Sequence, residues 1–110
     1  MTAKIFELQA EICRALAHPK RLEILHNLQN GELSAGDLAK LTGLAKANLS
    51  QHLTILKGQE LILSRRDGVT IYYRLANFKV GSACSLMREV LAERLHRQGE
   101  LSDFFKGLDN

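Results

Sequence analysis

Residues 41–56, with the sequence LTGLAKANLSQHLTIL, carry side chains of the types that read the edges of DNA bases. At about 100° per residue, Leu49, Leu53 and Leu56 fall in one narrow sector of a helix over 45–57, which indicates the buried side. Amide side chains pair with adenine edges, small methyl groups contact thymine methyls, and lysine suits a phosphate or a guanine. The opposite side of this helix has that composition, and its predicted DNA-binding residues are Lys46, Ala47, Asn48, Ser50, Gln51 and Thr54.

Residues 60–75, ELILSRRDGVTIYYRL, are predicted to form a basic β-hairpin. Two runs of alternating side chains are joined through Asp67-Gly68, a dipeptide suited to a tight turn that needs a positive φ. Arg65 and Arg66 are adjacent in one strand and therefore point to opposite faces. At most one of them should lie flat on a DNA phosphate, with the turn carrying the other.

Positive charge is concentrated in these two segments and the residues that directly flank them. The whole chain has a formal net charge of +3, but residues 40–79 alone carry seven lysines and arginines against two acids, a local +5. The rest of the chain carries a net −2. A basic patch that coincides with a reading helix and a hairpin is the electrostatic footprint of a phosphate-binding surface.

The flanking pattern predicts the elements that position these side chains. The 110 residues form a single domain, mainly α with a small β-hairpin, in which a helix-turn-helix spans about 34–57 and a wing spans about 60–76. A short final helix is expected beyond Gly99, from the spacing of Leu101, Phe104, Phe105 and Leu108. Other helices are expected over about 3–16, 19–30, 35–41 and 77–98, with a very short strand at 32–33 and a turn at 42–43.

The two outer helices, 3–16 and 77–98, carry more apolar surface than a winged core of this size can cover. Pairing them across a two-fold axis would bury that surface, which predicts a homodimer. The alternative is that both helices wrap their own core. The predicted interface residues are Ile5, Leu8, Ile12, Met87, Val90, Leu91 and Leu95.

Four segments closely resemble the ArsR/SmtB family of small bacterial winged-helix repressors. The resemblance implies a dimer held by the first and fifth helices, operator binding without effector, and release when an inducer occupies the protein. It also places the recognition helix at residues 45–57. The segments, in the family's order and spacing, are ALAHPKRLEIL (15–25), GELSAGDLAKLTGL (31–44), LSQHLTILKGQELI (49–62) and RRDGVTIYYRL (65–75).

The metal-sensing motifs of the family match this chain poorly. The thiolate pair of its arsenic and cadmium sensors lies in an ELCVCDL-like segment, which here reads ELSAGDL at 32–38, so soft-metal binding is excluded there. The family's fifth-helix zinc site retains only His96. We therefore predict no metal site and no cofactor, and we expect His52, beside the apolar sector, to be a hydrogen-bonded packing residue.

Residues 31–75 look most like the branch of the family that senses sulfide, persulfide or oxidants through one cysteine on the second helix and one on the fifth. The second-helix position is His26 here, whereas Cys13 and Cys84 lie on the predicted first and fifth helices. If those helices pack together, the two thiols form a candidate sensor. The alternative is that both are inert hydrophobic residues of the apolar stripes, with raised pKa values.

Several classes of protein are excluded by pattern. No apolar run reaches the roughly 18 residues of a membrane span, and charged residues interrupt the N-terminal segment, unlike a signal peptide. We therefore expect a cytoplasmic protein with reduced thiols and no membrane partner. No phosphate loop, nucleophile with a base, or carboxylate pair indicates an enzyme.

The favoured function is a homodimeric repressor that binds a double-stranded DNA operator and is released by an inducer, either a thiol-reactive species or an unidentified ligand. One alternative is a winged-helix module that contacts protein. Another is a metal-responsive repressor with a non-standard site.

Overall fold

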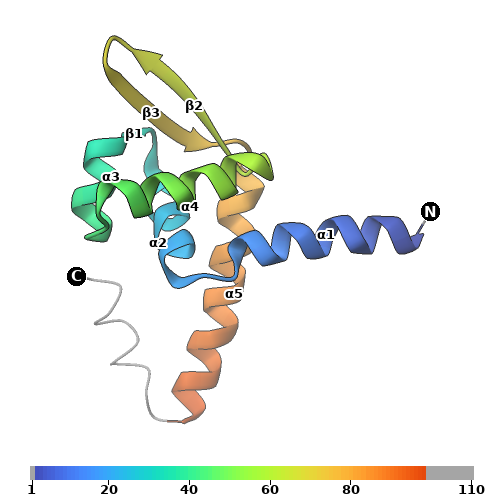
Figure 1. Ribbon diagram of the computed structural model, residues 1–110. Helices are drawn as coiled ribbons and strands as arrows, with labels where there is room; N and C mark the ends of the chain where they lie inside the picture. The colour runs from blue at the N-terminus through green and yellow to red at the C-terminus, as the bar shows by residue number, and fades with distance from the viewer. Residues whose placement is uncertain (1, 99–110) are drawn as a thin grey trace.

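Figure 1 shows a group of helices from which a β-hairpin protrudes. The computed structural model describes residues 2–98, so the predicted final helix beyond Gly99 lies outside the described residues. The predicted winged helix-turn-helix order is confirmed. In chain order the elements are α1 (Thr2–Leu16), α2 (Pro19–Asn27), the 3-10 helix η1 (Leu28–Asn30), β1 (Leu33–Ser34), α3 (Ala35–Thr42), α4 (Lys46–Gly58), β2 (Ile62–Asp67), β3 (Thr70–Leu75) and α5 (Phe78–Arg97).

Local capping interactions decide where the helices begin and end. The side chains of His18, Ser34 and Asn77 each accept a hydrogen bond from a backbone N–H two or three residues further on, at 2.9–3.1 Å. Pro19 follows the first of these caps, at a helix position where its missing N–H costs nothing. Gly43 ends α3 in the left-handed conformation with φ 71°, which supplies the turn of the helix-turn-helix.

The three strands form an antiparallel sheet in the order β1-β3-β2. Asp67 pairs with Thr70, so the hairpin loop consists of Gly68 and Val69. The predicted turn at Asp67-Gly68 is therefore wrong by one residue. Asp67 remains in the strand, and Gly68 alone supplies the positive φ, 63°, that a hairpin with glycine at its first loop position needs.

The core lies where α2, α3 and α4 meet the base of the sheet. Leu49, Leu53 and Leu56 are buried, as the helical period predicted for α4. The fully buried side chains of the other elements are Ile24, Leu25, Leu38 and Ile62. Burial of one face of α4 fixes which of its side chains remain in contact with solvent.

α1 and the C-terminal half of α5 project away from this core (Figure 1). α1 packs on α2 and α4, and α5 packs on α2 and β3. The described part of α5 buries only Gly81 and Cys84. Among the predicted interface residues, Leu91 and Leu95 are half-buried, whereas the exposed ones are Ile5, Leu8, Ile12, Met87 and Val90. Within residues 2–98 no helix combines the length and apolar character needed to cross a membrane.

Candidate nucleic-acid interface

The turn between α3 and α4 is held by hydrogen bonds to backbone groups. Thr42 is buried and its Oγ1 donates to the Leu38 carbonyl oxygen at 2.6 Å. Lys20 of α2 reaches the Thr42 carbonyl oxygen, also at 2.6 Å, and Glu23 at 3.1 Å. These contacts give hydrogen-bond partners to backbone carbonyl groups near the end of α3 and fix the start of α4 relative to α2.

The outer side of α4 presents the predicted reading residues to solvent. Lys46, Ala47, Asn48, Ser50, Gln51 and Thr54 are all exposed. The Thr54 hydroxyl donates to the Ser50 carbonyl oxygen at 2.8 Å, and no hydrogen bond within residues 2–98 occupies the Gln51 carboxamide. The N-cap residue Ala45 offers no side-chain acceptor, so the positive end of the α4 dipole keeps its first backbone donors for another partner.

The two wing arginines differ in their surroundings. Arg65 donates to Glu32 through Nε at 2.9 Å and through Nη2 at 2.7 Å. Its guanidinium also lies over the Tyr72 ring, 4.5 Å from the centroid. The Arg66 side chain is exposed and makes no hydrogen bond or ion pair with any other described residue. Of the two guanidinium groups, that of Arg66 is therefore the one without a partner in the described part of the chain, and its contact with phosphate stays a prediction.

Glu32 is a residue that sequence reasoning missed. It lies 33 positions from Arg65 and directly precedes β1. Only the strand order, with β1 and β2 on either side of β3, brings the two side chains together. The hydrogen bond from Arg65 lowers the pKa of the Glu32 carboxyl, and the same contact raises the pKa of Arg65.

A cavity of about 600 Å³ separates the wing from the helix-turn-helix. Val69 and Ile71 line it from the hairpin, and Lys46, Leu49 and Ser50 line it from α4. Arg66 pairs with Ile71 across the hairpin, and directly paired residues share a face of the sheet. The wing face that carries Arg66 is therefore the one turned toward α4.

His52 is a packing residue, as the sequence predicted. Its Nδ1 lies 3.2 Å from Arg21 Nη1, and because arginine can only donate, His52 accepts through this nitrogen. Its ring also lies against His18, with centroids 4.5 Å apart. Burial, followed by the charges of His18 and Arg21, lowers the pKa of His52. Since Arg21 also donates to the Ala15 carbonyl oxygen, this cluster connects the end of α1 to α4.

The two cysteines occupy different environments. Cys84 is buried, and burial raises the pKa of its thiol, which disfavours the reactive thiolate at neutral pH. Cys13 is exposed, so the expectation that it is buried on an apolar stripe is wrong for the single chain. The stripe on α1 is itself uncovered, because this helix meets the core only near its C-terminal end. In the described residues no three metal-ligating side chains lie close enough to hold a metal ion.

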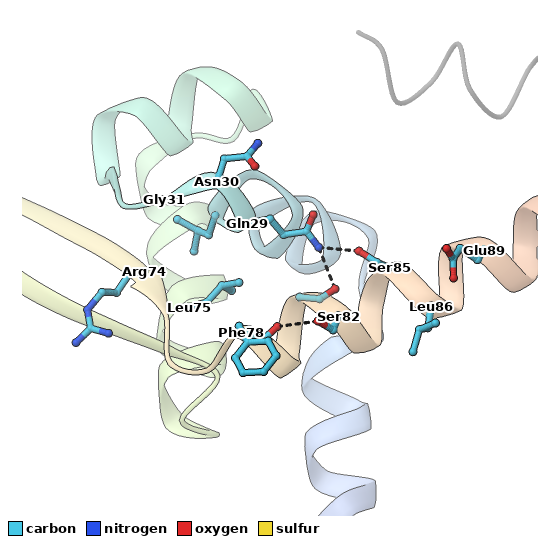
Figure 2. Close-up of a pocket in the computed structure, with 12 residues that line it drawn as sticks. Gln29, Asn30, Gly31, Arg74, Leu75, Phe78, Ser82, Ser85, Leu86 and Glu89 are labelled. Carbon is cyan, nitrogen blue, oxygen red and sulfur yellow. Dashed lines mark hydrogen bonds between the residues drawn. The ribbon is translucent and has the colours of Figure 1, made fainter.

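A second cavity of about 780 Å³ lies between η1, β3 and α5 (Figure 2). The Gln29 carboxamide crosses its wall and donates to the Gly81 carbonyl oxygen and the Ser85 hydroxyl, both at 2.9 Å. A Cβ on Gly81 would lie 3.2 Å from Gln29 and from Leu75, so glycine allows this close approach. These contacts attach the start of α5 to η1, whereas most side chains in the later turns of α5 are exposed or only half-buried.

The chain is similar to known proteins in sequence and in structure. Residues 18–64 match the family described as "Bacterial regulatory protein, arsR family". The HTH-type transcriptional regulator Rv0081 of Mycobacterium tuberculosis is 36% identical over 92 residues, which cover 83% of this chain and 81% of that protein. Nodulation protein NolR of Rhizobium meliloti is 48% identical over 67 residues, and the match spans 61% of this chain and only 55% of NolR.

Solved structures show the same relationship. The crystal structure of M. tuberculosis Rv0081 matches with a TM-score of 0.78 and 35% identity, covering 86% of this chain and 95% of that one. A homodimeric winged helix-turn-helix DNA-binding domain from Mycobacterium bovis, determined by NMR, matches with a TM-score of 0.80 and 33% identity, covering 87% and 89%.

Proposed function

We propose that this chain, which belongs to the arsR family of bacterial regulatory proteins, is a homodimeric transcriptional repressor that binds a specific DNA operator and is released from it by an inducer. It acts by binding rather than by catalysis, and in the cytoplasm, where bacterial DNA lies.

One observation carries the proposal: α4 buries its leucines and turns an uninterrupted row of small and amide side chains to solvent. Gln51 lies in the middle of that row and has both hydrogen-bonding groups of its carboxamide available. Bidentate pairing of glutamine with an adenine edge needs that arrangement. Lys46 lines the cavity between α4 and the wing, and Arg66 shares its face of the sheet with Ile71, which lines the same cavity. These two side chains supply charge for the flanking phosphates.

The dimer follows from the apolar side chains that the single chain leaves uncovered. On α1, Ile5 is 62% exposed, and on α5, Met87 and Val90 are 69% and 60% exposed. A second copy would cover these helices and present two copies of α4, the arrangement that two-fold helix-turn-helix proteins use on paired half-sites. The M. bovis relative is described as a homodimer, which supports this assembly.

Binding of fluorescent duplexes tests the proposal, with an operator selected from a random library and a scrambled duplex for comparison. Affinity should fall steeply with salt, because phosphate contacts release counterions. Gln51→Ala should cost about 1–3 kcal/mol on the selected operator and leave the scrambled duplex almost unchanged. Gln98→Ala, at the far end of α5, is the matched control and should change neither.

Two results would contradict the proposal. Equal losses on both duplexes would make Gln51 a backbone contact and the helical phase of the reading surface wrong. Weak binding without salt dependence would instead favour a module that contacts protein.

A further inference from the structure

An ion pair spans the outer face of the wing, on the side away from α4. The Arg65 side chain of β2 extends across β3, over the Tyr72 ring, and donates hydrogen bonds to both carboxylate oxygens of Glu32 at 2.7 and 2.9 Å. Arginine binds phosphate with the same bidentate geometry. Glu32 therefore occupies the donors that Arg65 would otherwise offer to DNA.

The stability of the protein does not require this pair. The Arg65 side chain is 53% exposed and that of Glu32 is 28% exposed, and ion pairs of that exposure contribute little to folding. The hairpin is already held by its complete β2–β3 ladder, from Ile62 opposite Leu75 to Asp67 opposite Thr70. We therefore expect the pair to affect the binding of DNA by the wing rather than the stability of the fold.

We infer that Glu32 takes the place of a DNA phosphate on Arg65 and thereby limits the number of phosphate contacts that the wing makes. This inference rests on the proposed function. Arg66 makes the wing's phosphate contact, while Arg65 is withheld. β2 is an edge strand of the sheet, so a released Arg65 side chain can turn around that open edge toward the DNA backbone beside Arg66.

Phosphate contacts are blind to sequence, so the contact that Arg65 does not make would strengthen binding to every duplex, the operator included. Withholding one arginine per protomer therefore lowers the affinity for all DNA by a similar factor and leaves the base contacts of α4 unchanged. The ratio of operator to non-operator affinity stays the one that the α4 contacts set, while the total affinity and its salt dependence are reduced.

The test is the salt dependence of binding to a scrambled duplex for the parent and Glu32→Gln. The variant keeps the size of the side chain and removes the charge that holds Arg65. Its logarithmic salt slope should become steeper by about one unit per protomer, or about two per dimer. Its affinity should rise by a similar factor for the scrambled duplex and for the operator.

Three further variants separate this mechanism from a general change in charge. Glu60→Gln removes the same charge from an exposed residue at the base of the wing that makes no ion pair within residues 2–98, and it should leave the slope unchanged. Arg65→Gln alone should also leave it unchanged, and in the double variant with Glu32→Gln it should abolish the steepening. Circular dichroism on all variants checks that the fold is intact.

The possible outcomes test this inference separately from the proposed DNA-binding function on which it rests. A parent that binds no duplex refutes both. A parent that binds with salt dependence, together with a folded Glu32→Gln variant of unchanged or shallower slope, overturns the role of Glu32 and leaves the proposed function standing. Equal steepening by Glu60→Gln would also overturn it, because the effect would then come from net charge.

Discussion

Replacing Val90 with aspartate tests the dimer most directly, because this side chain belongs to the exposed surface of the protomer. Val90 is 60% exposed, whereas Leu91 next to it is half-buried in its own chain. A change at Leu91 would disturb the protomer and the interface together. Val90→Asp should therefore leave the protomer folded and act on association alone.

The expected magnitude follows from the surface that Val90 still exposes. Full burial of such a side chain is worth about 1.5–3 kcal/mol, so the exposed three-fifths contribute roughly 1 kcal/mol per protomer. Enclosing an unpaired carboxylate in the interface costs several kcal/mol more unless it becomes protonated. Two-fold symmetry applies both losses twice. Since about 1.4 kcal/mol is a factor of ten, the dimer should weaken by at least a thousandfold.

Sedimentation equilibrium over a range of concentrations measures this change, and circular dichroism reports whether the helices remain. Ser82→Asp is the matched control, because Ser82 is an exposed α5 residue that lines the cavity beside η1. It should leave the dimer unchanged. The Val90 variant should be a folded monomer that binds the operator poorly. A folded Val90→Asp dimer with the association constant of the parent would refute the assigned interface.

Three further predictions concern the body of the protein. Gly43→Ala places a side chain at φ 71° and should cost about 1–2 kcal/mol in urea unfolding, and parent-like stability would contradict the assigned turn. Because the pKa of His52 is lowered in the folded protein, the unfolded chain takes up this proton first as the pH falls below about 6.5, so stability present above that pH is lost on acidification. Thermal unfolding at several pH values should show a smaller loss of stability on acidification for His52→Gln, whose carboxamide oxygen can still accept a hydrogen bond from Arg21. An equal loss in the parent and the variant would show that His52 does not cause it. In the monomeric Val90→Asp variant, a thiol reagent at neutral pH should label exposed Cys13 quickly and buried Cys84 slowly, measured by mass spectrometry, and equal rates would contradict the environments described above.

Much of the reading surface could be predicted from the sequence because a helix has a fixed period. Once residues 45–57 were assigned to one helix, the positions of Leu49, Leu53 and Leu56 decided its buried side and hence the exposure of Gln51. The caps at Ser34 and Gly43 are equally local, since each depends on hydrogen bonds or dihedral angles within a few residues. Such features follow from short stretches of chain whatever the rest of the fold does.

Features that depend on pairing between distant segments required the tertiary structure. The hairpin loop differs from prediction by one residue because the β2–β3 register, rather than the dipeptide, decides where the strands end. The different surroundings of Arg65 and Arg66 depend on Glu32, which only the β1-β3-β2 order brings within reach of Arg65. Strand order and register are set by packing over the whole domain, and a side chain's partner follows from them. The sequence by itself therefore determined which surface is proposed to read DNA, and the tertiary structure decided which of its charged side chains lack a partner within the protein.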